Sequence, residues 1–514
     1  MFSVASSTRV LSLALAAATA AIALAVSWQT PGHSWGDDFA GYLMQAKALL
    51  SATPAQELAL NARLMEASDW RTGPDAYPWG YPAILAIVAA TLGYSLSTFK
   101  IVSILSVGVV TLAAGLLAYT CRLGVVYAVC VAIVVGMQPD LTSLGNVIGS
   151  DAVFLALTAV ALLFAALALQ GWPRHSPPGH SSPGLRRWAL LGAAVVGCLS
   201  FFVRSNGAVT LLAIAASIVV VPVVAERRSV RSVALSAGVF ALACATLLGA
   251  YFALLPDGNM GLARWLTFEP SSLLRRSSDA VTAFGHFFPM MALADPLERP
   301  AVAAIAILAG VGTYRLGRIG FLLFLYSAGQ LLLVTLFPFG GGQRYYLPVL
   351  LGVAVLCAGG LEGLTSWAAR QVPSAGELKI ASSLLVVLLF GGAIAANLYR
   401  IDQQQQKTVD GPYSPAAAEF FAYMRRQPSD TQPVGFFKPR AMRLLAGKEA
   451  ILVREIGSTE RVNSIAIDRH QAAVQFQLSE SQVAALQDFQ PAFRNEEFTL
   501  YVRKRLVEAR RADL

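Results

Sequence analysis

Long apolar segments make up most of the first 400 residues of the chain, and shorter polar or charged segments separate them. Most of the apolar segments approach the ~20 residues that an α-helix needs to cross a bilayer. A transmembrane β-barrel would show short segments of alternating polarity instead. The pattern therefore predicts an all-α polytopic membrane protein with about 11 to 13 transmembrane helices. The predicted segments are 9–28, 81–96, 100–119, 122–138, 151–170, 188–203, 207–225, 233–255, 301–317, 319–337, 345–361 and 378–398.

The arginines between these segments predict which side of the membrane each loop faces. Residues 171–188 and 225–231 each carry three arginines, and the positive-inside rule assigns both loops to the cytoplasm. Alternation then places residues 29–80, and everything after residue 400, on the outer face. Twelve crossings from a cytoplasmic N-terminus would instead end inside. Either one segment fails to cross, with 81–96 the best candidate, or a short helix in 139–150 is missing.

Two polar regions are expected on the outer face. Within 29–80, the apolar residues of 37–50 recur at helical spacing, which predicts an amphipathic helix at the membrane interface. Residues 401–514 form a water-soluble extracytoplasmic α/β domain, separate from the transmembrane domain of residues 1–400. Its first helix is predicted to begin at Ser414 and Pro415, and a short helix is predicted to end at Gly447.

Composition agrees with a membrane protein. The chain is 56% hydrophobic and 13% charged, with a mean hydropathy of +0.58, whereas soluble domains carry about 25% charged residues. The net charge of +9 follows from arginines in cytoplasmic loops, so no nucleic-acid partner is implied. The five cysteines lie within or beside apolar segments without CxxC spacing, which indicates buried, inert thiols.

The adjacent carboxylates Asp37 and Asp38 are the first candidates for chemistry. Aspartate at a helix N-terminus can cap the backbone, but one residue is enough for that. A carboxylate beside an apolar wall can also act as a general base or bind a cation. Asp151, which opens an apolar helix on the same face, has the same two interpretations. With His286 of the outer loop, Asp37 and Asp151 are the candidate ligands of a divalent metal.

Arg204 and Arg344 are both predicted at outer helix ends, where the positive-inside rule disfavours arginine. A guanidinium suits phosphate binding through paired hydrogen bonds, and the alternative is contact with lipid headgroups. Tyr345 is grouped with them as a substrate-binding candidate, and three glycines before Gln343 would allow close approach of a ligand.

Other polar and aromatic residues have structural interpretations. The aromatic residues of YPWGYP (77–82) suit an interfacial belt, and Lys438 and Arg440 are either solvated or in contact with lipid phosphates. The chain has no Walker A, HExxH or GxSxG motif. The sequence motifs that usually indicate NTP-driven transport, zincin proteolysis and α/β-hydrolase chemistry are therefore absent.

Four motifs in this order resemble GT-C glycosyltransferases such as protein O-mannosyltransferases and the lipid A aminoarabinose transferase. They are the acidic pair followed by YLMQAKAL, the helix start PWGYPAILA, GSDAVFLALTAVALLF, and QRYYLPVLLGVAVLCAGGL. The resemblance covers most of the chain. It implies an inverting transferase that takes a sugar from a polyprenyl-phosphate carrier and passes it to a glycan, lipid or protein acceptor. It also implies a bacterial inner membrane location, with the C-terminal domain in the periplasm.

The resemblance also implies that one acidic residue of the first outer loop is the catalytic base. Aligning the motif on Tyr42 matches Asp38, and Phe39 stands where the family has glutamate, so both Asp37 and Asp38 stay candidates. The lysine and glutamate that aminoarabinose transferases carry near YPWGYP are absent. The alternatives are a transporter or flippase of a lipid-linked sugar, a lipid-linked oligosaccharide polymerase or ligase, and a non-catalytic scaffold.

Overall fold

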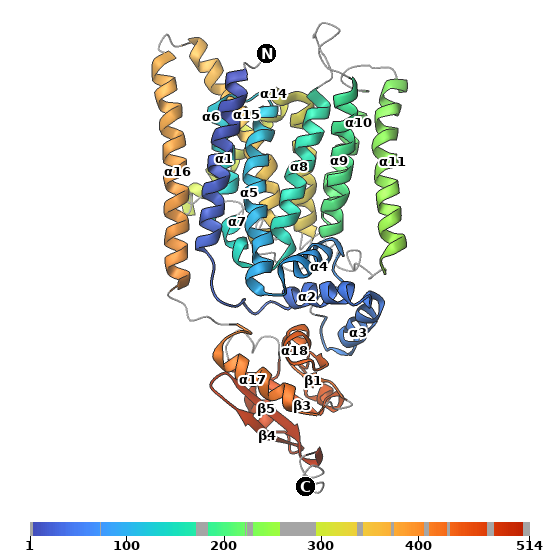
Figure 1. Ribbon diagram of the computed structural model, residues 1–514. Coiled ribbons are helices and arrows are strands. Elements are labelled where there is room, and N and C mark those ends of the chain that lie inside the picture. Colours follow the sequence, from blue (N-terminus) through green and yellow to red (C-terminus); the bar gives the residue numbers. More distant parts are fainter. Residues whose placement is uncertain are drawn as a thin grey trace.

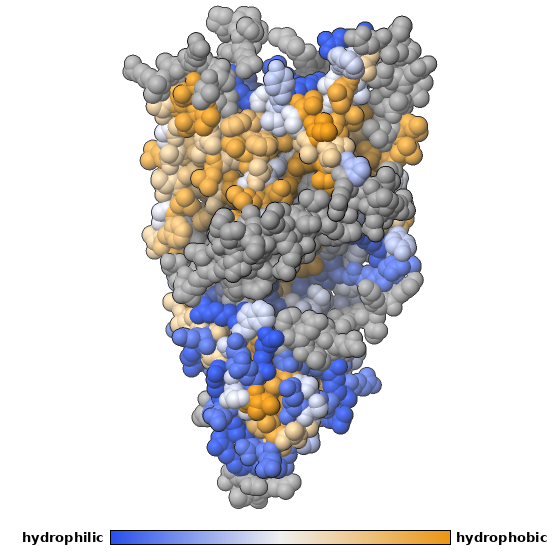
Figure 2. All heavy atoms as spheres, turned by 180° about the vertical axis from the view of Figure 1, so that it is seen from behind, coloured by the Kyte–Doolittle hydropathy of each residue, from blue (hydrophilic) through white to orange (hydrophobic). Residues whose placement is uncertain are grey.

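The structure is a computed structural model that describes residues 4–71, 73–170, 183–220, 223, 230–256, 295–336, 343–371, 375–405, 411–428, 432–469 and 477–506. A bundle of long helices forms one part of the molecule, and a small α/β domain lies at one end of it (Figure 1). Hydrophobic side chains dominate the visible surface of the bundle, while many hydrophilic ones cover the small domain (Figure 2). The predicted all-α membrane fold with a C-terminal α/β domain is confirmed.

Seven described helices are long and apolar enough to cross a membrane, and a bent pair makes an eighth candidate. The pair is α6 (Val125–Gly136) with the short segment that contains α7 (Pro139–Ser143) and η1 (Leu144–Asn146). Two more predicted segments form α10 (Gly207–Val220) and α16 (Ala375–Gln405), which stand in the same bundle (Figure 1). The seven are α1 (Val4–Ser27), α5 (Leu96–Thr120), α8 (Ser150–Gln170), α9 (Pro183–Val203), α11 (Val230–Leu254), α14 (Asp295–Leu336) and α15 (Leu347–Gln371).

The predicted segment 81–96 forms α4 (Gly80–Leu92), which has 13 residues. Such a helix is about 20 Å long, less than the ~30 Å hydrocarbon core of a bilayer. It lies at the end of the bundle, above α2 in Figure 1. In α14, a break at Gly317, with φ of +59°, separates two predicted segments. The short helix that 139–150 was expected to hold is present as α7 and η1, but it forms one bent pair with α6. Among the described helices, leaving out α4 and counting α14 as two passes gives an odd number, which favours 81–96 as the segment that does not cross.

Residues 29–80, the segment that the sequence predicts as an outer loop and that is called the outer loop below, contain α2 (Asp37–Leu50) and α3 (Pro54–Ala67). The predicted helix in 37–50 is therefore present, but it does not leave a polar face open to water. Every residue from Phe39 to Ala46 is buried, because α2 packs between α4 and α18 (Pro439–Ala446) of the C-terminal domain. One consequence is that the first outer loop and the C-terminal domain form a common core.

A five-stranded mixed sheet organises the C-terminal domain. Its strand order is β2-β1-β3-β5-β4, with β1 parallel to β2 and β3, and β5 antiparallel to β3 and β4. The predicted helix start and stop are confirmed: the Ser414 hydroxyl accepts from the backbone N–H of Ala417, and Gly447 ends α18 in the left-handed conformation. The elements are α17 (Pro415–Arg426), β1 (Val434–Gly435), β2 (Ala450–Ile451), η4 (Ile456–Arg461), β3 (Ser464–Asp468), α20 (Glu480–Ala484), β4 (Phe489–Arg494) and β5 (Phe498–Arg503).

The end of α3 is joined to this domain by backbone hydrogen bonds. The N–H of Asp69 donates to the carbonyl of Leu452, and the N–H of Leu452 donates to Oγ of Ser68. The Asp69 carboxylate accepts from the N–H groups of Arg454 and Glu455 at 2.7 and 3.1 Å. Since these bonds lie beside β2, the outer loop extends the C-terminal domain and holds it against the bundle.

The position of α4 gives a topology prediction. Single cysteines at the exposed residues Ser34 and Ser97, which flank α2 to α4, should react with a membrane-impermeant maleimide from the same side of the membrane. A cysteine at Arg187, at the opposite end of α9, should react only from the other side. Labelling of intact and permeabilised cells measures this. Opposite access for Ser34→Cys and Ser97→Cys would mean that α4 crosses.

Candidate active site

Asp37 stabilises a helix other than its own. Gly36 is the N-cap of α2, so neither aspartate fills that position. The Asp37 Oδ1 atom instead accepts from the backbone N–H groups of Arg440 at 3.0 Å and Ala441 at 3.4 Å. Both N–H groups belong to the first turn of α18, where a helix offers no acceptor of its own. The N-cap residue, Lys438, makes no side-chain cap bond. Asp37 therefore caps the first turn of α18 from outside.

Asp38 points into a different network. The Tyr77 hydroxyl donates to Oδ1 of Asp38 at 2.5 Å and accepts from Nη1 of Arg440 at 2.8 Å. Burial raises the pKa of Tyr77 well above its usual value, the charge of Arg440 acts against this, and the charge of Asp38 adds to it. The phenol therefore stays protonated at neutral pH and keeps a proton to donate to Asp38.

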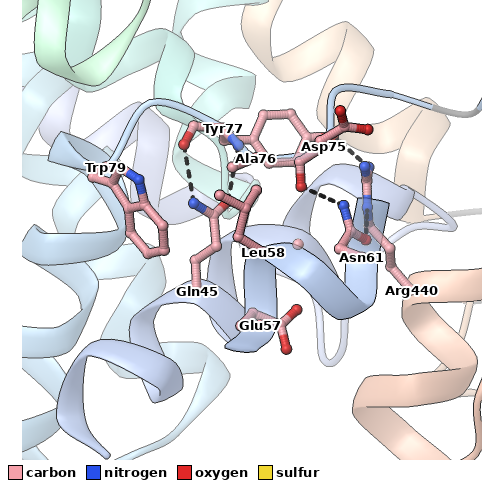
Figure 3. A pocket seen from close by; sticks show the side chains of 10 residues that line it. Gln45, Glu57, Leu58, Asn61, Asp75, Ala76, Tyr77, Trp79 and Arg440 are labelled. Atoms are coloured by element: carbon pink, nitrogen blue, oxygen red, sulfur yellow. Dashed lines mark hydrogen bonds between the residues drawn. The ribbon is translucent and has the colours of Figure 1, made fainter. Parts of the chain in front are cut away.

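Arg440 connects the two aspartates. Its side chain is only 1% exposed, and Nη1 lies 3.7 Å from Oδ2 of Asp37. Nε donates to Oδ1 of Asn61 at 3.2 Å, and Nη2 donates to the carbonyl of Pro74 at 2.5 Å. Figure 3 shows the side chain beside Asn61, with Tyr77 further along the same pocket. The expectation that Arg440 is solvated or contacts lipid phosphates is wrong.

A second charged cluster lies at the ends of α8, α9 and α15. Arg204, the residue after α9, forms an ion pair with Asp151 in the first turn of α8. Tyr345 lies between two guanidinium groups, 5.3 Å from Arg204 and 5.0 Å from Arg344. These four residues line one pocket with Asn206. Since an arginine has five donors, the pair with Asp151 leaves others for a ligand.

The aromatic residue Tyr42 joins the two clusters. Its ring lies 4.4 Å from that of Tyr77, and its hydroxyl hydrogen bonds to Oγ of Ser150 at 2.9 Å. Oγ of Ser150 also accepts from Nη1 of Arg204 at 3.5 Å. Burial, followed by the charge of Asp38, raises the pKa of Tyr42 well above its usual value, so this side chain also stays neutral.

Asp38 shares an electrostatic environment with both arginines of the second cluster. Burial acts to lower the pKa of Arg204, but the charges of Asp151, Tyr345, Tyr42 and Asp38 outweigh it and raise the value. For Arg344, burial again acts downward, and Asp151, Tyr345 and Asp38 raise the pKa. The structure thus brings Asp151, Arg204, Arg344 and Tyr345 together in one pocket. It connects Asp38 to them through Tyr77 and Tyr42, and it turns Asp37 toward the C-terminal domain.

Two of the three candidate metal ligands, Asp37 and Asp151, lie in the described residues, and each contacts an arginine. Within the described ranges, no three His, Cys, Asp or Glu side chains lie close enough together to hold a metal ion. Asp37 contacts Arg440, and Asp151 contacts Arg204. His286 and the three glycines of 340–342 lie outside the described residues.

Several buried residues of this region were not recognised from the sequence. The aromatic residues Tyr77, Trp79 and Tyr81 are at most 8% exposed, so the prediction of an interfacial belt is wrong. His33 is buried, with Nε2 accepting from the N–H of Ile148, and burial lowers its pKa to about 4. Lys100 donates to the carbonyl of Thr30 at 2.9 Å. The sequence feature that could have indicated this burial is the concentration of polar and aromatic residues next to an apolar helix.

Comparisons with known proteins confirm the fold. No protein-family model and no curated protein sequence matches the chain. Among solved structures, it is similar to ArnT of Cupriavidus metallidurans bound to undecaprenyl phosphate, with 11% identity, a TM-score of 0.59, and coverage of 95% of this chain and 97% of that one. It is also similar to the oligosaccharyltransferase AglB of Archaeoglobus fulgidus in complex with an inhibitory peptide and a dolichol-phosphate, with 14% identity, a TM-score of 0.54, and coverage of 88% and 69%. Both are GT-C glycosyltransferases, so the chain has the fold that its motifs predicted.

The capping role of Asp37 gives a stability prediction. Asp37→Ala should lower the free energy of unfolding by about 2 to 4 kcal/mol, because the first turn of α18 loses its cap and the buried Arg440 loses a carboxylate. Asp37→Asn keeps an acceptor oxygen for the N–H groups and should lose less. Thermal unfolding of the purified protein in detergent measures both. An unchanged midpoint in Asp37→Ala would contradict the capping role.

Proposed function

We propose that this protein is an integral membrane glycosyltransferase that moves a sugar from a polyprenyl-phosphate carrier to an acceptor hydroxyl, with Asp38 as general base. The observation that carries the proposal is a series of contacts from the carboxylate of Asp38 to two arginines at one end of the bundle. Tyr77 donates to Asp38, the ring of Tyr42 lies beside that of Tyr77, and the Tyr42 hydroxyl bonds to Ser150, which accepts from Arg204. Tyr345 lies within 5.3 Å of both Arg204 and Arg344. The fold is shared with proteins whose structures hold undecaprenyl phosphate or dolichol phosphate.

The reaction uses the two kinds of charge differently. The acceptor oxygen attacks the anomeric carbon of the sugar, and its proton passes to Asp38. The bond between the anomeric carbon and the phosphate oxygen breaks, and the electron pair leaves with the carrier phosphate. Arg204 and Arg344 stabilise the negative charge that develops there. Attack opposite to the leaving group inverts the anomeric centre.

The hydrogen bonds support Asp38 over Asp37 as the base. Asp37 is 5% exposed, and its oxygens face the backbone of α18 and the guanidinium of Arg440. Asp38 is half-buried, and only its Oδ1 atom takes part in a hydrogen bond within the described residues. Its Oδ2 atom is thus the carboxylate oxygen that an acceptor hydroxyl can approach.

The proposal includes an orientation. The positive-inside rule assigns the end of α9 at Arg187 and the break in α14 beside Arg318 to the cytoplasm, and the opposite end of the bundle bears Asp38 and the C-terminal domain. We place the enzyme in a bacterial inner membrane, with this end in the periplasm. A lipid-linked phosphate would then meet its acceptor at the outer membrane surface.

The role of Asp38 is tested by its amide variant. Asp38→Asn should reduce transfer at least about 10²-fold, because the amide keeps the size of the side chain but accepts no proton. Asp37→Asn is the matched control and should keep most of the activity. Mass analysis of surface glycans from cells without the protein, and from cells with each variant, identifies the product and measures transfer. Normal transfer by Asp38→Asn would disprove the proposed mechanism.

The phosphate role is tested on Arg344, which lies in the pocket with Asp151 and Arg204 but keeps enough solvent exposure to be changed with little effect on folding. Arg344→Gln should weaken binding of undecaprenyl phosphate about 10- to 100-fold, the equivalent of losing charged hydrogen bonds. Arg187→Gln, at the other end of the bundle, should bind normally. Native mass spectrometry of the purified proteins with undecaprenyl phosphate gives the comparison. Equal affinities in both variants would exclude Arg344 from the phosphate site.

A further inference from the structure

Arg440 belongs to the C-terminal domain, but its guanidinium group is surrounded by another part of the chain. The hydrogen-bond partners of that group are Asn61, Pro74 and Tyr77. All three lie in the outer loop between α2 and α4. Because the group is buried, these contacts are a fixed part of the fold rather than a flexible surface ion pair.

We propose that Arg440 is a positioning residue that orients the Asp38 carboxylate through Tyr77. This inference rests on the proposed function, in which Asp38 is the base. A phenol has one proton. Because Nη1 of Arg440 donates to the Tyr77 oxygen, the phenol proton is directed to Oδ1 of Asp38. The carboxylate is then held by one oxygen, and the other oxygen faces the acceptor.

The surroundings of Tyr77 hold it in this position. Nε2 of Gln45 donates to the Tyr77 carbonyl at 2.9 Å, and the Tyr77 N–H donates to Oε1 of Gln45 at 3.0 Å; both lie close together in Figure 3. The ring packs directly on α2 at Gly41, where a Cβ atom would stand 2.7 Å from it. The Arg440 guanidinium lies 5.1 Å from the centre of the ring. Tyr77 is therefore fixed at its backbone, its ring and its hydroxyl.

The site is consequently incomplete without the C-terminal domain. Asp37 caps the first turn of α18 and so fixes the backbone from which Arg440 extends, while Asp38 receives the effect of that arginine through Tyr77. Asp37 thus holds the C-terminal domain in place, and Arg440 of that domain orients Asp38 through Tyr77.

The same helix offers a matched control. Nη2 of Arg443 forms an ion pair with Glu57 of α3 at 2.7 Å, and its side chain is 8% exposed. It therefore joins the same two parts of the molecule with a similarly shielded charge. No hydrogen bond recorded for Arg443 or Glu57 in the described residues involves Tyr77 or Asp38. A change at Arg443 tests attachment of the domain without the path to Asp38.

The experiment compares Tyr77→Phe, Arg440→Gln and Arg443→Gln with the parent protein. Tyr77→Phe keeps the ring and removes only the hydroxyl, so it remains informative if Arg440→Gln fails to fold. The probe is a water-soluble carbodiimide, which modifies carboxyl groups. The rate at which Asp38 is modified in the intact protein is measured by peptide mass spectrometry at one fixed pH.

Loss of the Tyr77 hydroxyl should raise the rate of Asp38 modification about tenfold, because the carboxylate loses the charged hydrogen bond that holds its Oδ1 atom. Arg440→Gln should raise the rate at least as far, and Arg443→Gln should leave it unchanged. Transfer by Tyr77→Phe in cells should fall about tenfold. An unchanged modification rate in Tyr77→Phe would overturn this inference alone, whereas active Asp38→Asn would overturn the proposed function.

Discussion

The burial of one positive charge, that of Arg440, is the constraint on which the outer part of the molecule depends. Moving a guanidinium out of water costs several kcal/mol unless partners replace the lost solvent. Here the partners are the Asp37 carboxylate, the Tyr77 hydroxyl, the Asn61 amide and the Pro74 carbonyl. They come from α2, α3 and the segment before α4. A single side chain therefore requires these segments and the C-terminal domain to assemble around it.

This constraint explains why two carboxylates stand side by side at the edge of an apolar bundle. Consecutive helical residues point about 100° apart, so Asp37 and Asp38 at the start of α2 face different partners. Asp37 faces the backbone and guanidinium of Arg440. Asp38 accepts a hydrogen bond from Tyr77 and interacts electrostatically with Arg204 and Arg344. The mutual repulsion of the pair is offset because each carboxylate has its own positive surroundings.

Features with a local physical cause could be predicted from the sequence. Apolar segment length predicted the membrane helices, and the caps at Ser414 and Gly447 predicted where helices of the C-terminal domain begin and end. Arg204 and Arg344 were singled out because arginine at an outer helix end is unusual. The burial of Arg440 and Tyr77 could not be predicted, because their partners lie hundreds or tens of residues away and only folding brings them together.

The depth of the charges favours the proposed transferase over a transporter of a lipid-linked sugar. A transporter places its binding groups near the middle of the membrane, between broken helices. In this chain, Asp151 begins α8, Arg204 follows α9, and Arg344 precedes α15, so all three lie at helix ends on one side. Charges there avoid the high cost of the hydrocarbon interior, and they lie at the level where the phosphate of a membrane lipid would be. The short α4 lies at this end of the bundle, and α2, which carries Asp38, packs against it. The proposed transfer needs this arrangement, because the base must stand at the level of the lipid phosphate.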